Sequence, residues 1–190
     1  MLGNMCDISQ VGLYESAEKI ISVPLTIIAA LGTVMLPRTT NLLSNNNEEK
    51  AKKYLKNAIL SMILISLPII LGLFSISDIL SVLYFGEGFK DTAILIKLLS
   101  IAILFTGIAN VIRTQYLIPK ERDKEYIISV SAGAIINIIL NSILIPKYNA
   151  VGAVIGTVCA EMTVCIIQII FFNEIDILYK TINVPDWSRT

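Results

Sequence analysis

Long apolar runs separated by short polar segments dominate this chain. Residues 127–172 organise the rest, because they hold two apolar runs joined by the short polar connection Ile145-Pro146-Lys147-Tyr148-Asn149. A helix rises about 1.5 Å per residue, so about 20 residues cover the roughly 30 Å of a bilayer's hydrocarbon core. No water reaches that depth, so each run has to satisfy its own backbone hydrogen bonds, which predicts helices.

Five such runs predict an all-α polytopic membrane protein, with residues 1–190 forming one transmembrane domain. The predicted spans are residues 16–35, 55–74, 92–111, 127–145 and 151–172. Asp7 and Asp91 are expected N-caps, the first helix beginning near Ile8, and Pro24 is expected to kink the first span. Between and after the spans we expect polar loops at 39–56 and 113–125, a short interfacial piece at 78–84, and an amphipathic tail at 173–190 with Tyr179 and Trp187.

Composition agrees with a membrane protein and excludes several function classes. The chain is 55% hydrophobic and 16% charged, with a mean hydropathy of +0.74, whereas soluble domains are about a quarter charged. Net charge is zero and no basic stripe with interleaved aromatic residues is present, which argues against nucleic-acid binding. The chain has no histidine, and its three cysteines show no CxxC spacing. The sequence therefore predicts no enzyme, no cofactor and no metal site.

Basic residues are distributed unevenly between the predicted polar segments. Segments 38–56 and 113–124 and the tail together hold eleven Lys and Arg residues, while the opposite side holds Lys90 and Lys147. The positive-inside rule then predicts a multi-pass protein of the cell (cytoplasmic) membrane, with its C-terminus in the cytoplasm and its N-terminus outside.

Polar side chains inside spans are costly in lipid, so they are candidates for function. On the fifth span, Gly152, Gly156, Ala160 and Thr163 form a small-residue stripe that favours close helix packing, and the opposite face is polar. The first and fourth spans each carry a polar stripe as well. The candidate substrate- or cavity-lining residues are Glu15, Lys19, Thr26, Asn137, Asn141, Thr157, Glu161 and Gln168.

The sequence leaves two interpretations open for several of these residues. Glu161 is either a cavity carboxylate that binds cationic groups, sugar hydroxyls or a coupling proton, or a buried residue paired between helices. Asn137 and Asn141 either bridge helices, which we favour, or bind sugar hydroxyls. Lys97 stands near one end of its span, and snorkelling to the interface accounts for it.

Several short motifs resemble one transporter family. They are Asn137-Ile-Ile-Leu-Asn141, Leu144-Ile145-Pro146-Lys147-Tyr148, Gly152-Ala153, Gly156-Thr157 with Glu161, Met1-Leu2-Gly3, Val11-Gly12-Leu13-Tyr14 and Leu36-Pro37-Arg38. Together they resemble the C-terminal portion of polysaccharide (O-antigen or capsule) repeat-unit flippases, a branch of the multidrug/oligosaccharidyl-lipid/polysaccharide exporter superfamily.

The resemblance implies a two-lobed, twelve-helix transporter that moves undecaprenyl-diphosphate-linked oligosaccharides across the lipid bilayer by alternating access. The chain would correspond to helices eight to twelve, part of the second six-helix lobe, and would be incomplete without an N-terminal lobe. Two other hypotheses remain open. One is a multidrug cation antiporter of the same superfamily, which predicts a carboxylate-rich cavity, and the other is a non-transporting membrane fragment or partner subunit.

Overall fold

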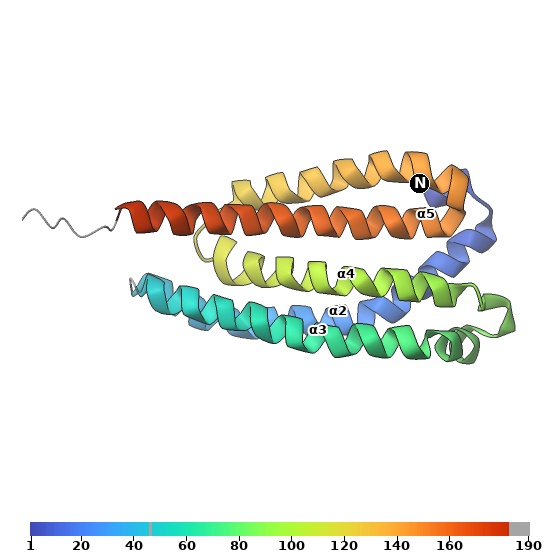
Figure 1. Cartoon of the computed structure of the whole chain (residues 1–190), viewed down its shortest axis with the longest axis horizontal. Coiled ribbons are helices and arrows are strands. Elements are labelled where there is room, and N and C mark those ends of the chain that lie inside the picture. Colours follow the sequence, from blue (N-terminus) through green and yellow to red (C-terminus); the bar gives the residue numbers. More distant parts are fainter. Residues whose placement is uncertain (46, 183–190) are drawn as a thin grey trace, which may run out of the picture.

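The chain folds into a bundle of long helices, shown in Figure 1. This computed structural model describes residues 1–45 and 47–182, except for the side chains of residue 48 and residues 173–182. The elements are α1 (Leu2–Met5), α2 (Ile8–Ser44), α3 (Glu48–Phe85), η1 (Glu87–Phe89), α4 (Thr92–Ile112), the π-helical segment η2 (Arg113–Leu117) and α5 (Asp123–Ile182). Four helices in the described part are long and apolar enough to cross a membrane, so the protein is an all-α, multi-pass membrane protein.

Helix α5 is a hairpin rather than one straight rod. Asn149 breaks its helical geometry with φ 51° and ψ −130°, a positive-φ conformation that is uncommon for residues other than glycine. We call residues 123–148 the first leg and residues 150–182 the second leg. Figure 1 shows the two legs lying side by side, and Gly133 of the first leg lies against Val164 of the second. The predicted spans 127–145 and 151–172 fall one in each leg.

The helices are longer than the sequence predicted. Most of the expected polar loop at 39–56 belongs to α2 and α3, although a helix start was favoured for its charge cluster at 48–53, and α3 does begin there. Helix α2 continues past Pro37 to Ser44, and α3 begins at Glu48, so the break between them is short. Segment 48–56 is rich in Glu, Lys and Ala, which favour helix, and it can stay helical beyond the apolar run because water solvates its charged side chains. Asp7 and Asp91 occupy the expected N-cap positions of α2 and α4.

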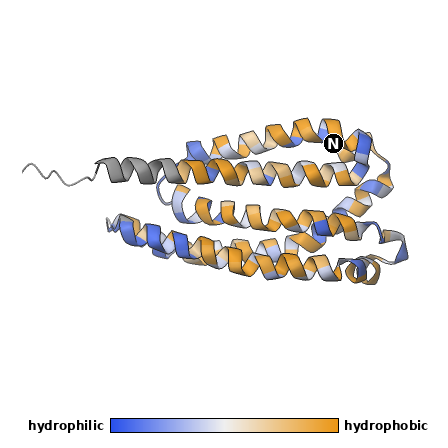
Figure 2. Cartoon of the chain, in the orientation of Figure 1, coloured by the Kyte–Doolittle hydropathy of each residue, from blue (hydrophilic) through white to orange (hydrophobic). Residues whose placement is uncertain are grey.

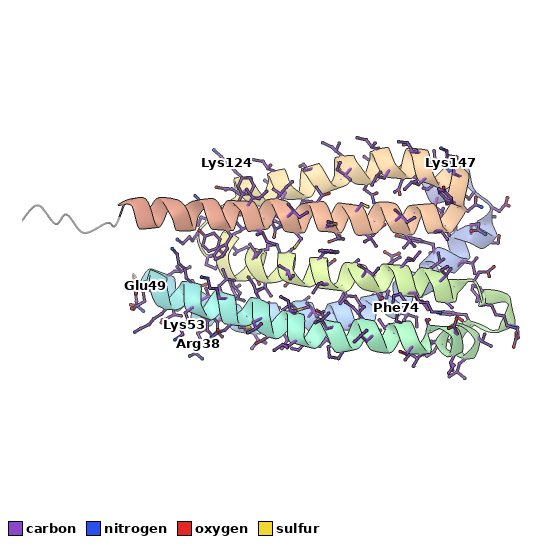
Figure 3. All side chains as sticks on the ribbon, in the orientation of Figure 1. Arg38, Glu49, Lys53, Phe74, Lys124 and Lys147 are labelled. Carbon is purple, nitrogen blue, oxygen red and sulfur yellow. The ribbon has the colours of Figure 1, made fainter. Side chains whose placement is uncertain are left out.

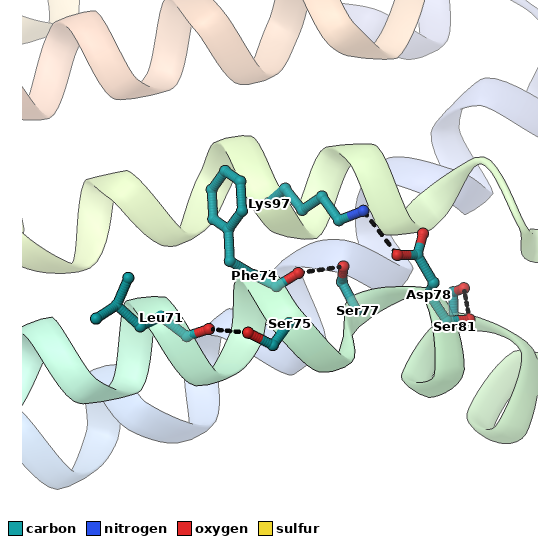
Figure 4. A network of polar contacts seen from close by, with 7 residues as sticks. All are labelled: Leu71, Phe74, Ser75, Ser77, Asp78, Ser81 and Lys97. Atoms are coloured by element: carbon teal, nitrogen blue, oxygen red, sulfur yellow. Dashed lines mark hydrogen bonds and ion pairs between the residues drawn. The ribbon is translucent and has the colours of Figure 1, made fainter.

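Two further segments that were expected outside the spanning helices also belong to helices. Residues 78–84 form the last turns of α3, and the expected loop at 113–125 begins with η2 and ends inside α5. The Asp78 carboxylate is tolerated in α3 because Lys97 of α4 reaches it at 2.7 Å, an ion pair that replaces the snorkelling expected for Lys97. Figure 4 shows this pair beside Ser77 and Ser81, whose hydroxyls donate to carbonyls of their own helix.

Helix α4 is the centre of the bundle, and small residues let its neighbours approach it closely. Of its most apolar stretch 56% is buried inside the protein, against 11% for α3. A Cβ atom added at Gly107 of α4 would collide with the side chain of Met62 in α3. One added at Gly32 of α2 would lie 2.6 Å from the Asn110 Oδ1 atom. Close approach at glycine is how helices associate in lipid, where no hydrophobic effect drives them together.

The two ends of the bundle differ in charge. Figure 2 shows hydrophilic residues gathered where α3 begins, at the end of the bundle where Figure 3 labels Arg38, Lys53 and Lys124. We call this the basic end. Lys147 lies at the opposite end in Figure 3, where the α5 hairpin turns. The expected tail at 173–190 is helical as far as Ile182, while the Tyr179 side chain and Trp187 lie outside the described residues.

The hairpin turn gives a test of this packing. A Cβ atom at Gly152 would meet the backbone of Leu144 and lie 2.9 Å from the Ile145 nitrogen, so Gly152→Ala should force the legs apart at a cost of about 1–3 kcal/mol. A Cβ atom at Gly12 in α2 meets nothing within 4 Å, so Gly12→Ala should be neutral or stabilising. Thermal unfolding in detergent should show a lowered midpoint for Gly152→Ala alone, and equal midpoints for both variants would contradict the hairpin geometry.

Candidate functional site

A polar cavity lies between α4 and the two legs of α5. Its volume is about 270 Å³ and it is open on one side. Polar groups from three helical segments converge on it, although each segment is otherwise strongly apolar. The residues that line it are Thr106, Ala109, Asn110, Arg113, Tyr126, Val130, Glu161, Val164 and Gln168. A concave site in which a few polar groups meet in apolar surroundings is the usual form of a ligand-binding site.

Glu161 is tied to α4 by a hydrogen bond. The Thr106 hydroxyl donates to the Glu161 Oε2 atom at 2.9 Å, and both side chains are half-buried. Glu161 stands near the middle of the second leg's apolar run and Thr106 near the middle of α4, so the pair lies deep in the bundle. The second carboxyl oxygen of Glu161 has no hydrogen bond to the described part of the protein, and the cavity leaves it accessible to a ligand.

A second polar layer lies nearer the basic end. Arg113 comes seven residues after Thr106, and Gln168 comes seven residues after Glu161. Because α4 and the second leg run in the same direction in Figure 1, Arg113 and Gln168 lie at a similar depth in the bundle. The Arg113 Nη1 atom donates to the Tyr126 hydroxyl at 3.4 Å, and its guanidinium carbon lies 5.6 Å from the centre of the Tyr126 ring. This cation–π contact holds the guanidinium group at the cavity wall.

Three buried polar atoms of the cavity residues lack a hydrogen-bond partner among the described residues. They are Asn110 Oδ1, Arg113 Nε and Gln168 Oε1. The Gln168 side chain is 99% buried, and its Nε2 atom donates to the Ser129 hydroxyl at 3.1 Å, which fixes the orientation of the amide. Leaving such groups unsatisfied costs about 1–3 kcal/mol each. Asn110 Oδ1 lies against Gly32 of α2, away from α5, so a ligand in the cavity would reach only the Arg113 and Gln168 atoms, and only after their side chains moved.

The π-helical segment η2 begins at Arg113 and continues α4 without a break. A π-helical turn shifts the register of the side chains, and such turns are frequent at functional sites. Two residues after Arg113, Gln115 points to the opposite side, where its Nε2 atom donates to the Gly32 carbonyl at 2.7 Å and its Oε1 atom accepts from the Thr39 hydroxyl. Gln115 thus anchors η2 to α2 and leaves Arg113 on the side of α5.

The sequence-predicted site residues fall into three groups. Glu161 and Gln168 line the cavity. Asn137, Asn141 and Thr157 form contacts between or along helices: Asn141 donates to Asn137 Oδ1 at 2.9 Å and packs over Gly156, and Thr157 shares a hydrogen bond of 3.1 Å with the Tyr14 hydroxyl.

The third group lies on α2 and takes no part in this cavity. Glu15, Lys19 and Thr26 are all exposed along that helix, and the Thr26 hydroxyl donates to the carbonyl of Ser22 at 2.8 Å. The polar stripe of the first span therefore stands apart from the other candidate residues.

Sequence reasoning did not select the α4 side of the cavity. Thr106, Asn110 and Arg113 follow a spacing of four and then three residues, which places them on one helical face. The sequence pattern shows that Thr106 and Asn110 share a face, but we expected the helix to end before Arg113 and placed that residue in a loop, so Arg113 was not added to the pair. Tyr126 carried no signal of its own, because its role depends on the fold bringing the start of α5 beside η2.

The described residues offer no cluster for a metal ion. No group of three or more His, Cys, Asp or Glu side chains comes together among them, and Cys6, Cys159 and Cys165 are free thiols. The cavity can therefore be described by one guanidinium group, one carboxyl group and several neutral hydrogen-bonding groups.

Membrane transporters commonly have substrate sites formed by polar groups between apolar helices near the middle of the bilayer, and the cavity between α4 and α5 resembles such a site. The chain belongs to the family described as lipid II flippase MurJ, whose model matches residues 1–184. It is also 25% identical, over 152 residues, to the probable low-salt glycan biosynthesis flippase Agl15 of Haloferax volcanii. That alignment covers 78% of this chain and 31% of the relative, so the chain spans about a third of the relative's length.

No solved structure matches the chain. The matches to the family and to Agl15 confirm the resemblance seen in the sequence as far as a family of flippases for lipid-linked glycans. The family that matches is the lipid II flippase family, and the narrower assignment to polysaccharide repeat-unit flippases is not what these matches identify.

The cavity predicts which residues water can reach. In a variant with the three native cysteines replaced by alanine, we expect Val164→Cys to react with a charged methanethiosulfonate reagent in membranes, because Val164 lines the cavity. Ile166→Cys, two residues along on another face of the same helix, should stay unreactive, because Ile166 is exposed on the apolar outside of the bundle where lipid would cover it. Equal labelling of the two positions would contradict a water-filled cavity.

Proposed function

We propose that this chain forms part of a flippase that carries a lipid-linked glycan across the cytoplasmic membrane. In this proposal the head group of the lipid enters the cavity between α4 and α5, while the lipid tail stays in the bilayer. The observation that carries the proposal is a guanidinium group beside several hydrogen-bonding side chains in a chain of the lipid II flippase family.

Arg113 is suited to the phosphate of such a head group. Guanidinium groups bind phosphate oxygens through paired, charge-assisted hydrogen bonds, and the buried Arg113 Nε atom has no partner among the described residues. The Tyr126 ring and hydroxyl hold the group in place at the cavity wall. A cationic drug would be repelled by the same guanidinium group, so the cavity favours a lipid-linked anion over the substrate of a multidrug cation antiporter.

The neutral and acidic groups of the cavity are suited to sugar hydroxyls. Gln168 Oε1 is an acceptor without a partner among the described residues, and Glu161 has a second carboxyl oxygen available. Each can accept a hydrogen bond from a hydroxyl group, and binding would remove the cost of leaving the buried Gln168 amide oxygen unsatisfied. We propose an undecaprenyl-diphosphate-linked glycan as the substrate, either a polysaccharide repeat unit or a cell-wall precursor.

We also propose how the chain is oriented in the membrane and that its activity is transport. With the basic end in the cytoplasm, as the positive-inside rule favours, Arg113 lies on the cytoplasmic side of Glu161 and meets the phosphate near the leaflet where glycan lipids are made. The cavity groups bind the substrate and leave its covalent bonds unchanged, so we propose transport and no enzymatic reaction.

Replacement of Arg113 tests the proposal. Arg113→Gln should weaken the binding of undecaprenyl diphosphate to the purified chain in lipid nanodiscs by about tenfold to a hundredfold, the size expected for a charge-assisted hydrogen bond. The matched control is Arg38→Gln, which removes an arginine stacked on Tyr54 outside the cavity and should leave the affinity unchanged. Equal losses of affinity in both variants would mean that surface charge in general causes the effect, and would contradict the proposed site.

A further inference from the structure

The cation and the anion of the cavity lie at different depths. Arg113 and Glu161 are the charged residues among those that line it. Glu161 is held beside Thr106, and Arg113 comes seven residues further along α4, so their backbones lie about 10 Å apart along the helix. A ligand that bound both groups would need a negative charge at one end and hydrogen-bond donors or a positive charge at the other.

The wall between these two groups favours donors over acceptors. The Gln168 amide nitrogen is already engaged by Ser129, so its Oε1 atom is the group left to bind a ligand. Beyond Arg113, a ligand would therefore meet the Gln168 amide oxygen and the Glu161 carboxyl oxygens, all of which accept hydrogen bonds.

We propose that Glu161 determines which glycans the site accepts, selecting neutral or amine-bearing sugars next to the phosphate and rejecting sugars that carry a carboxylate. The inference rests on the proposed function, because it takes Arg113 as the phosphate-binding group. When the phosphate lies at Arg113, the first sugars extend toward Glu161, near the middle of the apolar runs of α4 and α5.

The physical reason is like-charge repulsion at a site that water screens poorly. Two carboxylates a few ångströms apart repel each other far more strongly in a partly buried site than in bulk water. A hydroxyl group at the same position would instead donate a hydrogen bond to Glu161. Specificity that comes from an unfavourable contact with the wrong ligand needs no extra affinity for the right one.

The test uses two ligands that differ in one group. Undecaprenyl diphosphate linked to glucose and the same lipid linked to glucuronic acid differ only at the sixth carbon of the sugar. We expect the purified chain in nanodiscs to bind the glucose form at least about tenfold more tightly. Glu161→Gln should reduce that preference to less than about threefold by improving the binding of the glucuronic acid form. Gln keeps an oxygen that can accept from Thr106, so the variant should fold.

Two further measurements separate this inference from the proposed function. Glu15→Gln is the matched control, because Glu15 is exposed on α2 outside the cavity, and it should keep the full preference for glucose. Undecaprenyl diphosphate without a sugar should bind the wild type and Glu161→Gln equally. If sugar-free undecaprenyl diphosphate fails to bind, or binds regardless of Arg113, the proposed function is wrong and the inference falls with it. If it binds through Arg113 but Glu161→Gln keeps the preference, or the wild type has none, only the role of Glu161 is wrong.

Discussion

The hydrogen bond between the Thr106 hydroxyl and the Glu161 carboxyl group links α4 to the second leg of α5 in the middle of the bundle. A carboxyl group at that depth in lipid has to be paired, hydrated or both. Once the two helices are joined there and run in the same direction, the next residues at a spacing of seven, Arg113 and Gln168, are brought to a common level. The two polar layers of the cavity follow from this one pairing and from the regular rise of the helix.

The rest of the bundle holds α4 in place on its other sides. Gly32 and Gly107 allow α2 and α3 to pack closely against it, and Gln115 fastens the π-helical segment to the Gly32 carbonyl. The α5 hairpin is closed by contacts of its own, in which Gly152 and Gly156 pack against the first leg. Tight packing on one side and an open polar space on the other leave α4 as the wall of the cavity.

The sequence was sufficient for the parts of the structure that depend on periodicity. Apolar runs of membrane-spanning length predicted the helices, and the two faces of the fifth span separated the packing glycines from Glu161 and Gln168. Prediction from the sequence failed where a residue's position depends on tertiary contacts. Arg113 follows the apolar run and was predicted to lie in a loop, yet helical hydrogen bonding continues through it as a π turn. Asp78 and Lys97 looked like interfacial charges because their pairing depends on the packing of α3 on α4.

The parallel register of α4 and the second leg is the claim on which the cavity depends, and chemical cross-linking tests it most directly. In a variant without native cysteines, Asn110→Cys and Val164→Cys both face the cavity and should be joined in membranes by a short bifunctional thiol reagent. Asn110→Cys with Ile155→Cys should not be joined, since Ile155 lies nine residues earlier on the second leg, about 13 Å along the helix. Cross-linking of the second pair in preference to the first would contradict the account.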